Sequence, residues 1–189
     1  MNRRIVLLTA MGAALTGCSA TAAPPSASPR AVRAASMPQV PPLAIGVFRL
    51  APGLPPGSDR AVGLRAFRLL PPNKTSFAAY LGETLAEQLR LAGKLDSSAR
   101  FTVSADLIEN SANPKIGQAT GALAAIFRVT ENGVVRMEKT LRVEASWNSS
   151  FIGAVAIDAA EREYIALYSR LVETLLEDPD FRRTVAGKS

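Results

Sequence analysis

The hydrophobic and polar positions of the chain alternate with a period of two over five segments, which is the pattern of strands with one buried face. These segments are residues 43–50, 62–70, 100–109, 119–131 and 134–145. The last two flank Asn132-Gly133, a dipeptide that favours a type I′ turn because both residues adopt positive φ at little cost. The sequence therefore predicts five strands, of which the last two form a β-hairpin.

Two longer segments repeat their apolar residues every three or four positions, which predicts amphipathic helices over residues 73–91 and 154–176. Their apolar stripes consist mainly of Leu, Tyr and Phe, and charged residues occupy the other sides. Asp178-Pro179 then combines a capping residue with a proline that suits the first turn of a helix. A last short helix is therefore expected after residue 178.

The order of these elements, β-β-α-β-β-β-α, predicts an α+β fold in which a mostly antiparallel sheet forms one layer of a two-layer sandwich. Both amphipathic helices are expected on the same face of that sheet, because each has one apolar stripe to bury. We expect a single domain over residues 43–185 and a frayed tail over residues 186–189. The pattern does not fix the strand order, although residues 43–50 suit an edge strand that a second chain could extend.

The N-terminus has the three-part pattern of a secretory signal peptide. Basic Arg3 and Arg4 precede a mostly apolar, uncharged run over residues 5–15, and small residues follow. A helix that spans a bilayer needs about 20 apolar residues, so this run is too short for a permanent membrane helix. We therefore interpret residues 1–17 as a signal peptide that is removed.

The segment Leu15-Thr16-Gly17-Cys18 resembles the lipobox of bacterial lipoproteins, in which Leu, a small residue and Gly precede a Cys. The resemblance implies that the Cys18 thiol carries a diacylglycerol, that the chain is cut between Gly17 and Cys18, and that the new amine is acylated. Such an anchor is strong because each buried CH₂ contributes about 0.8 kcal/mol. Ser19 after the cysteine implies an outer-membrane protein that faces the periplasm. The alternative is an ordinary signal peptide with a chance Cys.

Residues 18–42 begin with this cysteine and continue as a segment rich in Ala, Pro and Ser. Six prolines fall among residues 19–42. Such a composition offers little apolar area for burial, and it is typical of disordered, partly extended linkers. The sequence therefore predicts a flexible tether between the anchored Cys18 and the domain.

The chain contains one Cys and no His. One Cys permits no disulfide within the chain, and the lack of His excludes Ser-His-Asp triads, Cys-His dyads and His-based zinc sites. Acylation would also remove the Cys18 thiolate from chemistry. We therefore expect no catalytic residue, no metal and no cofactor, and thus no enzyme. A hydrolase or acyltransferase that works through Ser, Asp or Glu is the less favoured alternative.

The charge balance is mildly basic, with 22 Lys and Arg against 16 Asp and Glu. Arg3 and Arg4 lie in the signal peptide, which leaves 20 basic against 16 acidic residues in the mature chain. No basic cluster is interleaved with aromatic residues, so we expect no nucleic-acid partner. The excess fits a solvated basic surface, with a mild attraction to anionic headgroups or lipopolysaccharide phosphates as the alternative.

The single Trp of the chain, Trp147, is followed by Asn148 and, a little later, by Phe151. An exposed Trp among hydrogen-bonding side chains can stack on a sugar ring or lie at a protein interface. Under that interpretation Trp147, Asn148 and Phe151 are candidate contacts for a ligand or partner. The alternative is a partly buried Trp that closes one end of the sheet.

The combination of a lipobox, a segment rich in Pro, Ala and Ser, and a small β-rich domain with two amphipathic helices resembles periplasm-facing envelope lipoproteins. The similarity is to the lipopolysaccharide-assembly lipoprotein and to the auxiliary lipoproteins of lipid-transporting ABC systems. It rests on FAAYLGETLAEQLRLAG and AAEREYIALYSRLVETLLEDPDF and covers most of residues 43–185. It implies a non-catalytic accessory or scaffold protein in envelope assembly or lipid transport, with an envelope protein or lipid as partner. The alternative function is an envelope glycan- or lipopolysaccharide-binding module.

Overall fold

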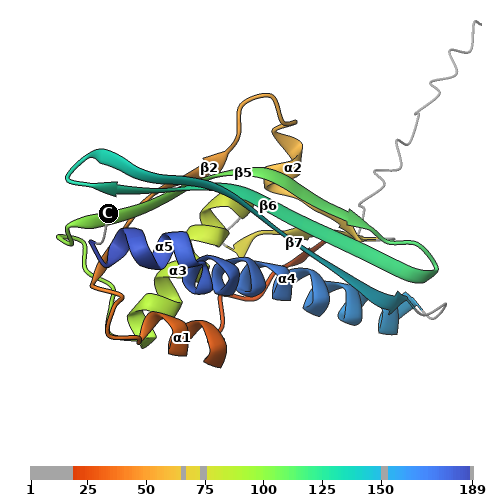
Figure 1. Cartoon of the computed structure of the whole chain (residues 1–189). Helices are drawn as coiled ribbons and strands as arrows, with labels where there is room; N and C mark the ends of the chain where they lie inside the picture. The colour runs from red at the N-terminus through yellow and green to blue at the C-terminus, as the bar shows by residue number, and fades with distance from the viewer. Residues whose placement is uncertain (1–18, 65–66, 73–75, 150–152, 188–189) are drawn as a thin grey trace, which may run out of the picture.

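The largest element of the fold is a four-stranded sheet, seen along its length in Figure 1. The computed structural model describes residues 19–64, 67–72, 76–149 and 153–187. The sheet consists of β2 (Leu43–Leu50), β5 (Phe101–Asn113), β6 (Gly117–Glu131) and β7 (Val134–Ser149), in the order β2-β5-β6-β7. β2 runs parallel to β5, whereas β5, β6 and β7 are antiparallel. The predicted edge position of residues 43–50 is therefore confirmed.

The turn between β6 and β7 has the predicted conformation. Asn132 has φ of 49° and Gly133 has φ of 83°, so both residues adopt the positive φ that this kind of turn requires. The strands on either side are longer than expected, because pairing continues through polar positions. The residues between the predicted strands 100–109 and 119–131 extend β5 to Asn113 and start β6 at Gly117, and the segment around Trp147 belongs to β7.

The two amphipathic helices, α3 (Phe77–Leu91) and α4 (Gly153–Glu177), lie on one face of this sheet (Figure 1). The hydroxyl of Ser76 caps α3 by accepting a hydrogen bond from the Ala79 N–H at 2.9 Å. The apolar stripes of both helices and the inward residues of the strands form one core. The predicted α+β sandwich is therefore confirmed.

A short helix, α5 (Pro179–Val185), follows α4 and is held by a charged contact to the sheet. Asp178 caps α5 by accepting from the backbone N–H groups of Asp180 and Phe181 at 2.9 and 3.0 Å. Lys139, which interrupts the apolar alternation of β7, donates to the carboxylates of Asp178 and Asp180 at 2.6 Å each. The interruption therefore has a structural role, because this inward Lys ties β7 to the start of α5.

A second, smaller sheet consists of β1 (Ser19–Thr21), β4 (Phe67–Leu70) and β3 (Val62–Leu64), in the order β1-β4-β3, and α2 (Gly57–Arg60) lies just before β3 in the chain. The prediction of one continuous strand over residues 62–70 is wrong, since β3 and β4 are antiparallel with Leu64 paired to Phe67. A single extended strand would place those two side chains on opposite faces. The reversal allows both to be buried.

The prediction of a disordered tether over residues 18–42 is wrong for the part that the structure describes. Ser19–Thr21 forms β1, and Pro29–Ala35 forms the helix α1, which packs against α3 and α4. Ala31 and Ala35 are fully buried, because small side chains let α1 approach its neighbours closely. Ser28-Pro29 is also a cap followed by a first-turn proline, a local signal that the overall composition obscures. Residues 19–21 and 29–35 therefore belong to the folded part of the chain.

All three tyrosines of the chain meet in the core between α3 and α4. The ring centroids of Tyr80 and Tyr168 are 4.9 Å apart, and those of Tyr164 and Tyr168 are 5.8 Å apart. The Asn110 side-chain oxygen accepts hydrogen bonds from the hydroxyls of Tyr164 and Tyr168, and its amide donates to the Ser58 carbonyl at 2.7 Å. Asn110 of β5 is therefore hydrogen-bonded both to α4 and to α2.

Candidate functional site

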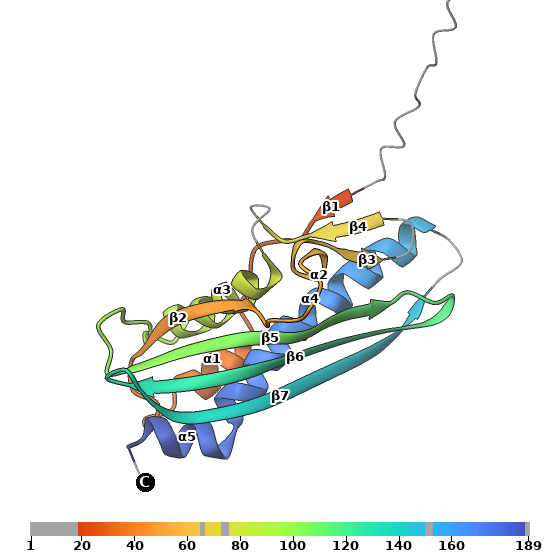
Figure 2. The ribbon, with the colours of Figure 1, turned by 90° about the horizontal axis from the view of Figure 1, so that it is seen from above.

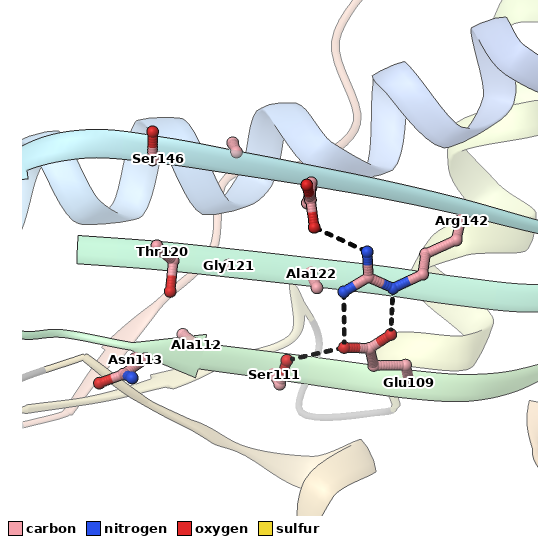
Figure 3. Close-up of a pocket in the computed structure, with 11 residues that line it drawn as sticks. Glu109, Ser111, Ala112, Asn113, Thr120, Gly121, Ala122, Arg142 and Ser146 are labelled. Atoms are coloured by element: carbon pink, nitrogen blue, oxygen red, sulfur yellow. Dashed lines mark hydrogen bonds and ion pairs between the residues drawn. The ribbon is translucent and has the colours of Figure 1, made fainter. Parts of the chain in front are cut away.

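The face of the main sheet opposite the helices carries a trough along its central strand β6 (Figure 3). Thr120 and Ala122 are short side chains on this face of β6, whereas Glu109 of β5 and Arg142 of β7 are long. Short side chains between longer ones leave a depression of about 620 Å³. It is also lined by Ser111, Ala112, Asn113, Gly121, Glu144, Ala145 and Ser146.

An ion-pair cluster closes one end of the trough. The Arg142 guanidinium crosses above β6 and donates to Glu109 at 2.8 Å and to Glu144 at 2.7 Å. These hydrogen bonds, together with the charge of Glu109, raise the pKa of Arg142 above its usual value. Ala124 is paired with Arg142 in the sheet register and is only 3% exposed, because the cluster covers it. Figure 3 shows the guanidinium between the two carboxylates.

A second row of charges continues across all four strands beyond this closed end. Arg49 of β2 donates to Asp106 of β5 at 2.7 Å, Arg128 of β6 donates to the same carboxylate at 2.6 Å, and Arg128 also reaches Glu138 of β7 at 2.6 Å. Burial alone would raise the pKa of Asp106, but the hydrogen bonds and charges of Arg128 and Arg49 outweigh it and lower that pKa. This row holds its own four long side chains in place on the outward face of the sheet.

The open end of the trough presents neutral hydrogen-bonding groups. Ser111, Asn113, Thr120 and Ser146 are exposed there, on three adjacent strands. The Ser111 hydroxyl donates weakly to Glu109 at 3.4 Å, and Glu109 is already held by Arg142. Both carboxylates that line the trough, Glu109 and Glu144, are thus paired with Arg142. The groups present are suited to hold a hydrogen-bonding ligand.

Two further properties concern the described part of the chain as a whole. Residues 19–64, 67–72, 76–149 and 153–187 contain no group of three or more His, Cys, Asp or Glu side chains that is placed to hold a metal ion. Within the same ranges, no helix combines the length and the apolar character that a membrane crossing needs.

The structure separates the residues predicted to contact a ligand. Trp147 is 8% exposed on the helix-facing side of β7, and its indole N–H has no hydrogen-bond partner within the described chain. Asn148 is exposed on the opposite side, because successive residues of a strand face opposite ways. Phe151, Gly17 and Cys18 lie outside the described residues. Trp147 therefore lies buried in the sheet, and its role as a contact for a ligand stays a prediction.

Trp147 is buried because Gly121 leaves room for its ring. A Cβ at position 121 would lie 3.0 Å from a Leu167 methyl carbon of α4 and 3.3 Å from the Trp147 ring. The helix and the indole therefore both approach the backbone of β6.

Sequence reasoning did not find the trough. The signal that could have indicated it is the small size of Thr120, Ala122 and Ala124, which alternate along one strand and share its outward face. The small residues indicate a depression only when the register of the strands is known, because the register places Ala122 between Ser111 and Glu144.

Comparison with solved structures shows a shared fold. A protein of the DUF330 family from Xanthomonas campestris aligns with a TM-score of 0.55 and 12% identity, over 84% of this chain and 95% of that one. A provisionally assigned lipoprotein from Caulobacter crescentus aligns with a TM-score of 0.46 and 16% identity, over 59% of this chain and 84% of that one. A minor lipoprotein from Acinetobacter baumannii aligns with a TM-score of 0.38 and 12% identity, over 71% of this chain and 91% of that one. No protein-family model and no curated protein matches the chain.

Of these three structures, only the Xanthomonas protein has a TM-score above 0.5, and its low identity limits the conclusion to the fold. Its alignment spans most of both chains, so the two proteins share the same general fold.

Proposed function

We propose that this chain is a lipid-anchored envelope protein with a non-catalytic, accessory or scaffolding role in envelope assembly or lipid transport. The observation that carries the proposal is the junction between the lipobox and the fold. Cys18 of Leu15-Thr16-Gly17-Cys18 is followed directly by Ser19, the first residue of β1. A signal peptide cut at this position would leave an intact domain with its acylated residue at the first strand.

The serine at position 19 supports the outer membrane as the location, with the domain on the periplasmic side. The chemistry of the chain supports a role without catalysis, because it has no His and its one Cys lies in the lipobox. The surface also supports binding of a partner. The sheet has two edge strands, β2 and β7, and the helices α1, α3, α4 and α5 all lie on one of its faces (Figure 1).

Acylation is the first test of the proposal. The full chain, produced with its own N-terminus in a bacterium and extracted from membranes, should have an intact mass that corresponds to cleavage before Cys18 and to the added acyl groups. The Cys18→Ser variant should lack this mass and should leave the membrane fraction. A chain that keeps residues 1–17, or a mature chain with an unmodified Cys18, would contradict the proposed anchor.

Crosslinking of the lipidated protein in intact cells tests the accessory role. Mass spectrometry then identifies the molecules that are crosslinked to it. We expect a recurrent envelope transport or assembly protein, which disappears with Cys18→Ser. Recovery of glycan or lipid alone would contradict the scaffold role and favour a binding module.

The trough favours such a binding module as the second candidate function, with an envelope glycan or lipopolysaccharide as ligand. Its open end offers hydroxyl and amide groups, which recognise sugar hydroxyls. Ala122→Phe would fill the trough from its floor, and Thr140→Phe places the same ring on an exposed position of β7 outside it. Calorimetry with purified lipopolysaccharide should show loss of binding for Ala122→Phe alone. Equal binding by both variants would exclude the trough as the site.

A further inference from the structure

We propose that the domain rests on the membrane by one end, formed by the start of β1 and the tip of the β5–β6 hairpin, and that Ile116 at this tip enters the headgroup region. This orientation rests on the lipid anchor proposed above. It concerns which surface of the domain meets the lipid.

Cys18 is joined directly to Ser19, the first residue of β1, with no spacer between them. One peptide unit, about 3.8 Å between Cα atoms, separates Cys18 from Ser19. Ser19 is paired with Arg68 of β4, and the Ala22 N–H donates to the Leu70 carbonyl at 2.8 Å. Acyl chains on Cys18 would therefore hold the β1 end of the small sheet within a few residues' reach of the bilayer, whereas a long tether would let the domain stand away from it.

The tip of the β5–β6 hairpin lies toward the end of the molecule that carries the start of β1. The β5–β6 connection lies at the same end of the molecule as the start of β1 in both views (Figures 1 and 2). The Asn132-Gly133 turn, α5 and the C-terminus lie at the opposite end. An anchor at β1 therefore turns the tip at residues 113–117 toward the membrane and the Asn132-Gly133 turn away from it.

The tip of this hairpin combines an exposed apolar side chain with an exposed basic one. Ile116 is 55% exposed, and its neighbour Lys115 is exposed as well. Neither Lys115 nor Arg68 has an ion-pair partner among the residues that the structure describes. An apolar side chain beside a lysine suits the boundary between headgroups and acyl chains, because the lysine stem lies along the apolar layer while its ammonium stays near lipid phosphates. The tip is thus complementary to an anionic lipid surface.

The opposite end supplies a matched comparison. Val134, next to the Asn132-Gly133 turn, is 54% exposed and therefore almost equal to Ile116 in exposure. Both side chains are apolar, and each lies at or next to one end of β6. Exposure alone does not distinguish them, so a difference between them in the presence of lipid would come from orientation.

The test uses the full, lipidated chain reconstituted into vesicles of phosphatidylethanolamine and phosphatidylglycerol. Ile116→Cys and Val134→Cys each provide one free thiol, since the sulfur of Cys18 is held in a thioether, and each is labelled with an environment-sensitive fluorophore. We expect a shift of emission to shorter wavelength and quenching by nitroxide-bearing lipids at position 116, and neither at position 134. A label at 116 that stays in water, or equal quenching at both positions, would overturn the proposed orientation.

The same samples separate this inference from the proposed function. Intact mass reports the acylation of Cys18 directly. If Cys18 is acylated but the fluorophore at position 116 remains in water, the proposed orientation is contradicted and the lipid anchor is not. An unmodified Cys18 contradicts the anchor and the orientation that depends on it.

Discussion

The buried side-chain amide of Gln88 in α3 is hydrogen-bonded to the backbone of Ser28, 60 residues earlier in the chain. The Ser28 N–H donates to the Gln88 side-chain oxygen at 2.8 Å, and the Gln88 amide nitrogen donates to the Ser26 carbonyl at 2.9 Å. Gln88 is fully buried, so one side chain satisfies two backbone groups that α1 and α3 remove from water. This contact fixes the Ala- and Pro-rich segment on the domain.

Removal of this amide should release the N-terminal segment. We expect Gln88→Leu to lower the free energy of unfolding by about 2 kcal/mol, because a buried backbone donor and acceptor lose their partner. Denaturant unfolding measures the loss, and limited proteolysis should cut the variant near residues 24–28 while the wild type resists. Glu87→Gln is the control, since Glu87 forms only a surface pair with Arg90 and should leave stability and cleavage unchanged. Equal resistance of Gln88→Leu and wild type would contradict this role.

The close approach of β2 to α3 depends on Gly82. A Cβ at this position would lie 2.9 Å from the ring of Phe48, which is closer than two such atoms approach. In an isolated helix Gly→Ala is stabilising by up to about 1 kcal/mol, but here we expect Gly82→Ala to destabilise by about 1 to 3 kcal/mol through overpacking. Thermal unfolding measures the change, and Gly63→Ala, where nothing lies within 4 Å, is the control. A more stable Gly82→Ala protein would show that Phe48 can move without cost.

The row of charges through Asp106 should make stability depend on pH. Its folded-state pKa is lowered, so its contribution is fully present above the unfolded value of about 3.9 and is lost as pH falls through the folded value. We expect Asp106→Asn to be less stable than wild type near neutral pH by about 1 to 2 kcal/mol. The difference should shrink as the pH is lowered toward 3, as measured by urea unfolding at several pH values. A constant difference across this range would contradict the assignment.

The tyrosine cluster should resist ionisation while the protein is folded. Burial, with smaller contributions from the charges of Glu83 and Glu161, raises the pKa of Tyr80 to about 12. Burial also raises the pKa of Tyr164 and Tyr168, the other tyrosines. A raised folded pKa means that stability is intact below the unfolded value of about 10 and falls as pH rises above it.

Ultraviolet absorbance of tyrosinate and circular dichroism, recorded on the same sample, test this expectation. Tyrosinate should form together with the loss of circular dichroism, because ionisation requires exposure of the hydroxyls. Absorbance that rises with an apparent pKa near 10 while the dichroism is unchanged would show that the cluster is open to water.

Much of the fold could be predicted because its signals are local. The alternation in β5, β6 and β7, the stripes of α3 and α4 and the turn at Asn132-Gly133 each lie within one stretch of chain. The errors at β3–β4 and in the Ala- and Pro-rich segment have a common cause. Each depends on what a short segment meets in space, and α1 is stable only because α3 and α4 cover its alanines.

The candidate site was less predictable for the same reason. Trp147 was a candidate contact on account of its neighbours in sequence, but the strand places Trp147 and Asn148 on opposite faces. The trough joins Glu109, Ser111 and Arg142 from two strands, and their proximity follows from the register of the sheet.

The sequence by itself determined the elements with a clear period, the α+β class, the lack of His-based chemistry and the presence of Leu15-Thr16-Gly17-Cys18, which resembles a lipobox. These properties depend on residues that are close in sequence, because their spacing alone indicates a helix, a strand or a motif. Only the tertiary structure decided that Ser19–Thr21 and Pro29–Ala35 form part of the fold, that the outer face of the sheet has a trough, and that Ile116 and Val134 lie at opposite ends. Those relations join residues far apart in sequence, and only the packing of the core and the pairing of strands bring them together or apart.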